Sequence, residues 1–503
     1  MGVPAYFSHI LKEHANILIS KQQIQQPIHR LYMDCNSIVY DAYREITQKS
    51  PQHSPTYQEI IRNTISSIRR IIQDIQPTKT TYIAFDGVAP FAKMKQQRLR
   101  RFRNEYLLPK EVSTQAKSDK FQLYLITPGT RFMRELSQAM KLEFKKDKRI
   151  LLTTSDEAGE GEHKMMEHFR QNVSKKENVA IYGLDSDLIM LAVFHHHIAN
   201  QVYVFREAPE FFKSKIPITF QHPKEPYFID IKQFVHQIII EYNMSVYDYV
   251  FLCFLFGNDF LPHFPTLNLR TRAVQVIQDV YHNMQNKHKP IVQPPSKTTT
   301  YWTIQWQSFY AFLFQLSRIE HELFLQEYEI KERQEKRYFP ETTPEEKETA
   351  LQHVPQQYRS KEIYIDPKSN AWEKRYYKVL FPKEMSKEDI CVNYLEGIEW
   401  VFQYYTTSCK SWKWSYKYNY PPLLQDLIQY IPTRPYPEFT LLESNQEQLS
   451  PVDQMEFILP ATARFHEGLI PTIEKYQDIF EKECQVKYEW AFCKYMWESY
   501  MKE

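Results

Sequence analysis

The first half of the chain repeats one local pattern, a short apolar run followed by a segment with helical spacing. The apolar runs are RLYMDC (30–35), TYIAFD (81–86), RILLTT (149–154) and NVAIYG (178–183). SIVYDAYREI and DLIMLAVFHH, which follow the first and the last run, place apolar residues three or four positions apart. Alternating strands and helices predict an α/β fold with a mainly parallel sheet flanked by helices. In such a sheet the ligand site lies at the carboxyl ends of the strands.

The second half of the chain predicts a different organisation. After about residue 245 the sequence is mainly helical, beginning with VYDYVFLCFLFG. A charged, glycine-free stretch at 331–350 continues as a polar segment to about 370, and its low apolar content predicts an exposed, partly disordered connector. Order is expected to return at 372–381. We therefore predict three segments, 1–272, 273–387 and 388–503, with the last packing on the first.

Charge and cysteine content exclude several classes of protein. The 63 Lys and Arg residues nearly balance the 61 Asp and Glu residues, so the net charge of +2 predicts no partner. The six cysteines lack the spacing of a zinc site or a disulfide framework, which favours a reducing compartment. MGVPAYFSHI lacks the pattern of a signal peptide, and no apolar run reaches about 18 residues. We therefore expect no membrane contact and a cytoplasmic location, with the nucleus as the alternative.

Acidic residues follow four predicted strands at the ends where a ligand site is expected, and one more acid lies later, in FGNDFLP. There are seven of them: Asp34, Asp86, Glu160, Glu162, Asp185, Asp187 and Asp259. Each one alone is more simply read as a helix N-cap. Together they would converge on one edge of a parallel sheet, where they cannot all stay ionised without counter-charge. Carboxylates without histidine or cysteine ligands select hard ions such as Mg²⁺ or Mn²⁺. Two such ions about 4 Å apart activate water against a phosphodiester, so the pattern predicts nuclease or phosphatase chemistry.

Two glycines alternate with two of these acids in AGEGEHK (158–164). The chain has only nine glycines in 503 residues, where average usage of about 7% would give roughly four times as many. The spacing of Glu160 and Glu162 lets both carboxylates reach the same metals. Gly159 and Gly161 let backbone and substrate approach them closely.

A second group of candidate residues lies in PFAKMKQQRLRRFR (90–103), directly after Asp86. Lys93, Gln97, Arg100 and Arg101 fall within an arc of about 100° if this stretch is helical. A solvated basic helix face is the alternative for any such run. Beside a metal site, the same arc predicts a pocket that binds a terminal phosphate.

The order and spacing of these motifs resemble the XRN family of 5′-to-3′ exoribonucleases. The matching stretches are MGVP, YMDCNSIVY, AFDGVAPFAKMKQQRLRRFR, ITPGTRFM, GEGEHKMMEH, YGLDSDLIML and FLFGNDFLPHFP, followed by GIEWVFQYYTTSCKSWKWSYKYNYPPLLQDL and QMEFILPA. The resemblance covers nearly the whole chain and is weakest at 273–370.

The resemblance implies a nuclease core at 1–272 that is similar to PIN and flap-endonuclease folds, followed by helices. It implies that the seven acids bind two Mg²⁺ ions, with Mn²⁺ able to substitute, and that Lys93, Gln97, Arg100 and Arg101 hold a 5′-monophosphate. The implied activity is metal-dependent hydrolysis of single-stranded RNA with a 5′-monophosphate end into nucleoside 5′-monophosphates. A decapping or RNA-processing protein is the partner that the resemblance suggests.

The sequence departs from the family pattern in two places. Tyr40 stands where family members usually have a histidine whose ring stacks on the first base, and a tyrosine ring could stack in the same way. A second stacking ring is expected from the tryptophan-rich block, with Trp412 or Trp414 favoured over Trp400. The long β-rich extension of the cytoplasmic member is absent, since the chain stops soon after KYEW (487–490). We therefore expect a minimal catalytic core that is nearer in layout to the nuclear member.

Two other functions are compatible with parts of the sequence. A flap-type 5′ nuclease acting on DNA would share the carboxylates and the GNDFLP-like turn, but it would lack the QQRLRRF pocket and SWKWSYKYNY. A catalytically silent RNA-end binding protein would have lost metal ligands, whereas all seven acids are retained here. RNA rather than DNA as the substrate rests on the resemblance alone.

Overall fold

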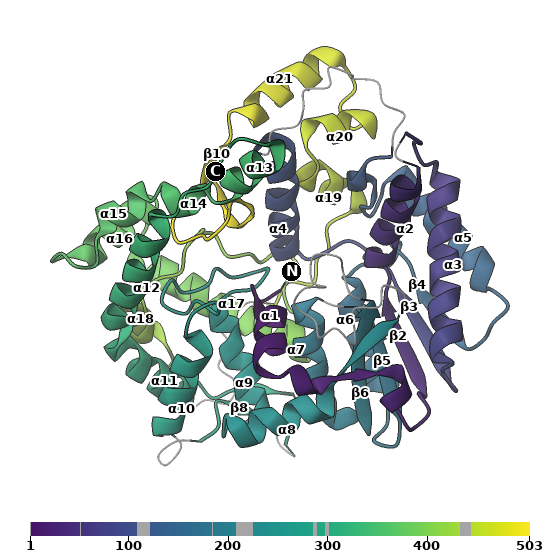
Figure 1. Cartoon of the computed structure of the whole chain (residues 1–503), viewed down its shortest axis with the longest axis horizontal. Helices are drawn as coiled ribbons and strands as arrows, with labels where there is room; N and C mark the ends of the chain where they lie inside the picture. Colours follow the sequence, from purple (N-terminus) through teal and green to yellow (C-terminus); the bar gives the residue numbers. More distant parts are fainter. Residues whose placement is uncertain are drawn as a thin grey trace.

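A seven-stranded sheet organises the N-terminal half of the chain (Figure 1). The computed structural model describes residues 2–50, 52–107, 121–183, 185–207, 225–284, 289–296, 301–432 and 444–502. The strands are β1 (Leu18–Ser20), β2 (Arg30–Asp34), β3 (Thr80–Ala84), β4 (Ile150–Thr153), β5 (Asn178–Tyr182), β6 (Gln201–Glu207) and β7 (Pro226–Asp230), in the order β1-β7-β6-β5-β2-β3-β4. The strands from β6 to β4 are parallel, whereas β7 and β1 pair antiparallel. The predicted mainly parallel sheet is confirmed, and the four indicated runs are β2, β3, β4 and β5.

Both faces of the sheet are buried, which explains why its strands are continuous apolar runs. On one face, Leu31 and Met33 of β2 pack with α2 (Asn36–Lys49), α3 (Tyr57–Ile75) and α5 (Arg131–Phe144). On the other face, Tyr32 joins the core that contains α6 (Gly161–Asn172), α7 (Ser186–Phe194) and α8 (Ile231–Glu241). Figure 1 shows α3 and α5 outside the sheet, and α6 and α7 between the sheet and the rest of the molecule.

The helix α3 illustrates how local sequence sets these elements. Thr56 caps its N-terminus in a capping box with Glu59. Its buried isoleucines recur with the helical period, so that one face packs on the sheet: Ile60, Ile61, Ile68, Ile71 and Ile75. Gln76 then ends the helix in the left-handed conformation, with φ at 52°.

The rest of the chain is mainly helical. Its helices are α9 (Val246–Cys253), α10 (Ala273–Met284), α11 (Trp306–Arg318), α12 (Glu320–Glu335), α13 (Pro344–Gln352), α14 (Val354–Gln357), α15 (Ser360–Ile365), α16 (Trp372–Leu380), α17 (Lys387–Thr406), α18 (Leu424–Leu427), α19 (Pro451–Ile458), α20 (Ala461–His466) and α21 (Ile473–Cys484). The strands β10 (Lys487–Glu489) and β11 (Tyr500–Lys502) pair near the C-terminus. Most of the buried apolar side chains of α17 belong to the same apolar core as α6 and α7, while Ile390 packs in a second cluster with α16. The sheet and the helical half therefore share one core.

The stretch 331–370 differs from its prediction. Where the sequence predicted a partly disordered connector, the chain forms the end of α12 and then α13, α14 and α15. Arg359 is buried, and its guanidinium pairs with Glu335 at 2.9 Å and with Glu362 at 3.0 Å. Lys331 pairs with Glu362 at 2.8 Å. Ion pairs add to a small number of buried apolar residues, such as Ala350 and Ile365, in holding this segment, and this low apolar content is why its composition suggested disorder. The boundaries of the three predicted segments stay predictions.

Within the described ranges, no single helix is long and apolar enough to cross a membrane. Ile231–Glu241 and Val246–Phe256 pass that test only when taken together, and they meet at an angle of 93°.

Candidate active site

The seven predicted acids lie at the carboxyl edge of the parallel strands or beside it. Asp34 is the last residue of β2, and Asp86 follows β3 by two residues. Glu160 and Glu162 open α6 after β4, Asp185 and Asp187 open α7 after β5, and Asp259 follows the short helix Phe254–Phe256. Because β5, β2, β3 and β4 are neighbours in the sheet, their loops meet at one edge. The N-terminal ends of α6 and α7, which favour negative charge, therefore face the same place.

Direct contacts and electrostatic coupling join these acids into one cluster, called the acid cluster below. The ammonium of Lys93 lies 2.5 Å from a Glu160 oxygen and 2.8 Å from an Asp259 oxygen. Charge interactions also link Asp34 with Asp86 and Asp185, Glu162 with Glu160 and Asp187, and Asp187 with Asp259. The structure thus brings all seven predicted acids together.

Backbone and amide groups hold Asp86 in place. The Gly161 amide donates to Asp86 Oδ1 at 2.7 Å, and Asn36 Nδ2 donates to Asp86 Oδ2 at 2.6 Å. A Cβ at position 161 would lie 3.1 Å from Asp34 Oδ1, so glycine lets this helix start close to two acids. Gly159 has φ of 105°, which glycine adopts readily. Glycine is therefore favoured at 161 by the close approach to Asp34 and at 159 by the backbone conformation.

The acid cluster is set up to attract cations. Burial raises the pKa values of Asp34, Glu160 and Glu162 above their ordinary values, and burial together with Asp259 raises the pKa of Asp187 to about 6. Among the described residues, Asp34 Oδ1 is buried without a hydrogen-bond partner. Bound divalent cations would stabilise the charged form of such carboxylates. The oxygen-rich donor set, with Lys93 already lying among the acids as a cation, fits hard divalent metals.

His163 lies beside the acid cluster, whereas the sequence predicted a metal site of carboxylates without histidine. One ligand atom each from Glu160, Glu162 and His163 lie within 4.8 Å of one another, a spacing that could hold a metal ion. Burial lowers the pKa of His163 well below its ordinary value, so the ring is neutral. The ring stacks on Tyr404 with a centroid distance of 3.4 Å and an angle of 25°.

The four predicted phosphate-binding residues lie on α4 (Phe91–Phe102), but they do not form one uniform group. Lys93 lies within the acid cluster. Gln97 is buried and accepts a hydrogen bond from Gln454 of α19 at 3.3 Å. Among the described residues, Arg100 and Arg101 form no ion pair, and Arg101 Nη1 is buried without a hydrogen-bond partner. A buried guanidinium nitrogen with an open donor favours an anionic ligand.

The predicted stacking rings are not paired in the structure. Tyr40 lies on α2, half-buried and near enough to Arg101 for its hydroxyl to influence the guanidinium. Trp412 is buried, and Trp414 stacks on Trp400 at 5.5 Å and 23°. No ring contact joins Tyr40 to either Trp412 or Trp414 in the part of the chain that the structure describes. A sandwich of two rings around a base stays a prediction.

Sequence reasoning missed two tyrosines from α17. The Tyr404 hydroxyl donates to Glu160 Oε1 at 2.7 Å, and the Tyr405 hydroxyl donates to Asp187 Oδ1 at 2.6 Å. Burial raises the pKa values of both tyrosines well above the ordinary value, so both hydroxyls keep their protons. The only signal was the adjacent pair in GIEWVFQYY, which carries no hint of partners more than 200 residues earlier.

Comparisons with known proteins identify two matching family models. The model described as "XRN 5′-3′ exonuclease N-terminus" matches residues 1–208, and "Xrn1 helical domain" matches residues 240–369 and 366–483.

Among curated relatives, 5′-3′ exoribonuclease 2 of Arabidopsis thaliana is 24% identical over 79% of this chain and 53% of its own length. The 5′-3′ exoribonuclease 2 homolog of Drosophila melanogaster is 24% identical over 93% of this chain and 65% of its own length. This chain thus spans between half and two thirds of these two relatives. A solved structure of the catalytic core of Rad2 with a DNA substrate is 16% identical, with a TM-score of 0.33 over 57% of this chain and 74% of that one.

Proposed function

The chain belongs to the XRN family of 5′–3′ exonucleases, and on this premise we propose that it is a metal-dependent 5′-to-3′ exoribonuclease. It hydrolyses single-stranded RNA with a 5′-monophosphate end and releases nucleoside 5′-monophosphates. One observation carries the proposal. The acid cluster adjoins α4, whose Arg101 has a buried guanidinium nitrogen without a partner among the described residues. A nuclease centre and a binding group for a terminal phosphate therefore share one helix.

The acid cluster is the proposed metal site. Asp34, Asp86, Glu160, Glu162, Asp185, Asp187 and Asp259 supply the oxygen ligands. Hard oxygen donors favour two Mg²⁺ ions, with Mn²⁺ able to substitute. When bound, these ions supply an activated water and neutralise charge on the phosphodiester. The protein's own contribution is orientation, because Gly161, Asn36, Tyr404 and Tyr405 fix the carboxylates from outside the cluster.

Arg100, Arg101 and Gln97 are the proposed receptors of the 5′-phosphate. A guanidinium offers two parallel donors to phosphate oxygens, and Arg101 presents its open nitrogen from a buried position. Gln454 orients the Gln97 amide through its hydrogen bond. We expect the site between α4 and α19 to hold one phosphate and to exclude a cap or a triphosphate. Binding the end in this way positions the first phosphodiester at the acid cluster.

Lys93 connects the two parts of the site. Its ammonium contacts Glu160 and Asp259, while Gln97 lies one turn further along the same helix. We propose that Lys93 contacts the phosphate of the scissile bond once substrate enters, so that positive charge bridges the pocket and the metals. Tyr40, near Arg101, is proposed to stack on the first base, with Trp412 or Trp414 as the second ring.

The experiment that tests this function compares three substrates of one sequence. They are RNA with a 5′-monophosphate, the same RNA with a 5′-triphosphate, and single-stranded DNA, each incubated with Mg²⁺ and with EDTA. We expect mononucleotides from the monophosphate RNA alone, and none in EDTA. Faster cleavage of the DNA would favour a flap-type nuclease. Tight RNA binding without hydrolysis under any metal condition would make the protein an RNA-end binder.

A further inference from the structure

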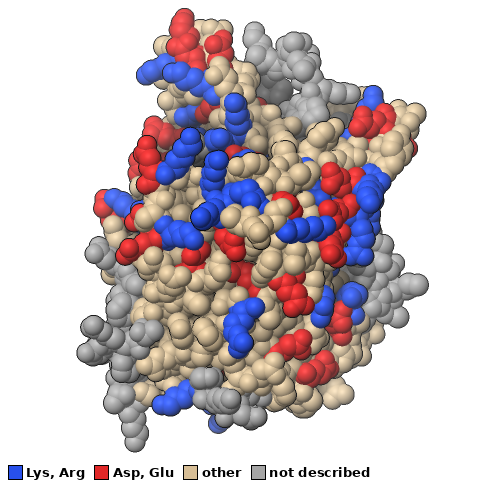
Figure 2. All heavy atoms as spheres, turned by 90° about the vertical axis from the view of Figure 1, so that its left-hand side faces the viewer, with Lys and Arg blue, Asp and Glu red and all other residues tan. Residues whose placement is uncertain are grey.

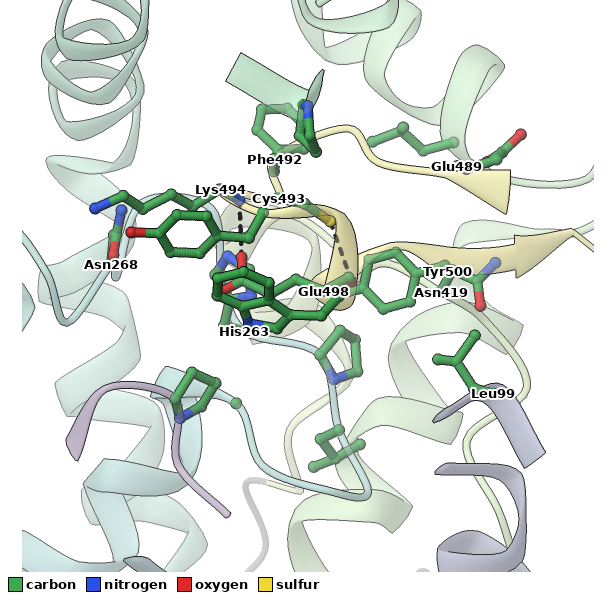
Figure 3. A pocket seen from close by; sticks show the side chains of 18 of the residues that line it. Leu99, His263, Asn268, Asn419, Glu489, Phe492, Cys493, Lys494, Glu498 and Tyr500 are labelled. Carbon is green, nitrogen blue, oxygen red and sulfur yellow. Dashed lines mark hydrogen bonds between the residues drawn. The ribbon is translucent and has the colours of Figure 1, made fainter. Parts of the chain in front are cut away.

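The helical half carries a large cavity that the proposed catalytic chemistry does not use. On the face that carries α12, α15 and α16, Lys and Arg side chains gather in the upper half, with Asp and Glu among them (Figure 2). A cavity of about 1350 Å³ is lined from this side by α12 and α16, and from the other side by α4 and the loop at 256–271. The segment 489–502 forms a further wall, where Phe492, Lys494 and Tyr500 can be followed in Figure 3.

The cavity lies on the side of α4 that the phosphate-binding residues do not occupy. Ala92, Gln96 and Leu99 line it, whereas Gln97 and Arg101 do not. Since each helical residue advances about 100°, the two groups are centred about 150° apart on α4. Gly2 and Asp259 also line the cavity, and Asp259 contacts Lys93 within the acid cluster. The cavity therefore reaches the acid cluster from behind α4.

The lining has the chemistry of a site for an anion. Eleven Lys and Arg residues line the cavity against four Asp and Glu residues. At least four of the eleven are ion-paired, namely Arg270, Lys331, Arg359 and Lys502, so the positive charge offered to a ligand comes from the others, such as Lys378, Lys383 and Lys494. Several lining polar atoms are buried without a hydrogen-bond partner among the described residues, namely Gln96 Oε1 and Nε2, Asn258 Nδ2, Gln356 Oε1 and Arg359 Nη2. Buried polar atoms are normally satisfied, so these are available to a ligand or to ordered water.

Aromatic rings complete the lining. Tyr495 and Trp497 stack with a centroid distance of 4.1 Å and an angle of 14°, and Lys494 Nζ lies 5.2 Å from the Tyr495 ring centre. Trp497 is 47% exposed, so its ring offers a face for stacking. Cations, open amide groups and an exposed ring are what a phosphate, a base edge and a base plane each require. Lys378, Lys383 and Lys417 also line the cavity and are exposed, so it opens to solvent at that end.

We propose that this cavity receives the nucleoside 5′-monophosphate released by each hydrolysis. The proposal rests on the exonuclease function proposed above. An exonuclease that stays on its RNA keeps the remaining strand on the phosphate-binding side of α4, where it blocks the way back for the product. The cavity offers the product a second exit route, which begins at Asp259. It has room for a nucleotide, and its positively charged lining attracts the nucleotide's phosphate. The helix α4 then separates the side where RNA arrives from the side where product leaves.

Photolabelling tests the cavity without requiring activity. The protein is irradiated in EDTA with 8-azidoadenosine 5′-monophosphate, and labelled peptides are mapped. We expect label within 487–502, competed by AMP but not by adenosine, because the phosphate carries the charge. Lys494→Glu should lower this labelling at least about threefold, whereas Lys374→Glu, at an exposed position outside the lining, should not. Label confined to peptides around α2 and the acid cluster, or no competition by AMP, would overturn the proposal.

A kinetic test separates this proposal from the proposed function. Leu99→Trp narrows the cavity from α4 without touching the phosphate-binding side. We expect an unchanged first cleavage in single-turnover experiments and a steady-state rate lowered about fivefold or more, as for blocked product release. Leu142→Trp, at a position that is 77% exposed on α5, is the matched control, and Leu99→Phe is the milder variant if the first does not fold. Equal steady-state rates would contradict the exit role. If the unaltered protein does not hydrolyse RNA, the proposed function is wrong. Photolabelling would still decide whether the cavity binds nucleotides.

Discussion

Asp187 shows how a single carboxylate is held in the acid cluster. It lies in the first turn of α7 and accepts a hydrogen bond from the Tyr405 hydroxyl at 2.6 Å. It also packs against Gly2, where any side chain would collide with its carboxyl group. Burial, with Asp259 as a like charge beside it, raises the pKa of Asp187 to about 6. Such a group stays charged at neutral pH most easily next to a cation.

Replacing Asp187 by Ala should remove hydrolysis and leave RNA binding unchanged or tighter. The substitution deletes a metal ligand and a charge that repels phosphate. We expect the rate to fall at least about 100-fold, the scale expected for one lost charge-stabilising contact. Hydrolysis rates and RNA dissociation constants should be measured together, with Asp156→Ala, at an exposed acid, as the control. Undiminished turnover in Asp187→Ala would rule out the metal assignment.

Replacing Arg101 by Ala should weaken the preference for a 5′-monophosphate. A hydrogen bond to a charged group contributes about 1.5 to 3 kcal/mol, so kcat/KM for monophosphate RNA should fall roughly ten- to 150-fold. Arg134→Ala, which removes an exposed arginine from α5, is the charge-matched control. The readout is the ratio of kcat/KM for monophosphate and hydroxyl ends. A ratio identical to that of the unaltered protein would show that Arg101 binds no terminal phosphate.

The sequence predicted where some of the site residues lie and missed others. Six of the acids were predictable because each follows a strand whose position in a parallel sheet is fixed by topology, whereas Asp259 follows a short helix and its place beside the sheet does not follow from strand order. The assignment of Lys93 to the phosphate pocket from its helical arc stays a prediction, and the structure adds that its ammonium pairs with Glu160 and Asp259. Helical spacing gives the direction of a side chain and does not say which loop it meets. Tyr404 and Tyr405 were missed because helical spacing likewise does not show which distant carboxylates their hydroxyls contact.

Among the elements, α17 gives the most direct link between the two halves of the chain. Tyr404→Phe and Tyr405→Phe each remove one hydroxyl from a carboxylate of the acid cluster. A hydrogen bond contributes about 1 kcal/mol net, so each variant should need roughly five times more Mg²⁺ for half-maximal activity.

The control for the α17 variants is Tyr376→Phe, whose hydroxyl donates to the Pro421 carbonyl at 2.9 Å, away from the acids. A second readout is thermal stabilisation by added Mg²⁺, which does not depend on turnover. Both α17 variants should require more Mg²⁺ for the same stabilisation, and the control should not. Unchanged metal dependence in all three proteins would make the two tyrosines packing residues only.

A buried glutamate at the start of α12 should make the free energy of unfolding depend on pH. This residue, Glu320, accepts hydrogen bonds from the amides of Leu424 and Gln425 at 2.7 and 3.2 Å. Burial raises its pKa from 4.5 to about 8. The folded protein therefore binds a proton that the unfolded chain releases between these values. Stability from this group is complete below pH 4.5 and is lost as pH rises towards 8, by about 1.4 kcal/mol per pH unit at most.

The measurement is the free energy of unfolding from pH 6 to pH 8 for the unaltered protein and for Glu320→Gln. Because the amide does not titrate, the unaltered protein should lose stability relative to Glu320→Gln as pH rises. Glu322→Gln, at an exposed position on the same helix, should follow the unaltered protein. A difference that stays constant across this range would contradict the raised pKa.

The elements themselves were predictable where burial was continuous. The strands β2 to β5 are unbroken apolar runs because helices cover both faces of the sheet. The edge strand β1 has only three residues, and it was not predicted. The helices of 331–370 were also missed, because buried pairs such as Arg359 with Glu362 stabilise them and apolar content does not reveal such pairs.

At the scale of the whole molecule, the site depends on both halves. The carboxyl edge of the sheet supplies six of the acids, and the segment after α9 supplies Asp259. The helix α17 supplies the two hydroxyls, and α19 supplies Gln454, which donates to Gln97 of the proposed phosphate pocket. All of these elements except α19 contribute to one shared core. The spatial meeting of these segments could not be read from local patterns, because each contact joins residues that are far apart in the sequence.

The central claim is that hydrolysis starts at a 5′-phosphate end held by α4 and proceeds along the strand. The most direct test uses one RNA sequence in two forms, linear with a 5′-monophosphate and circular. The circle contains every phosphodiester bond of the linear RNA and the one that closes it, so only an end-dependent enzyme spares the circle. With Mg²⁺ present, the linear RNA should be converted to mononucleotides while the circle remains intact. Cutting of the circle at a comparable rate would contradict the claim, because the acid cluster would then act without the phosphate pocket.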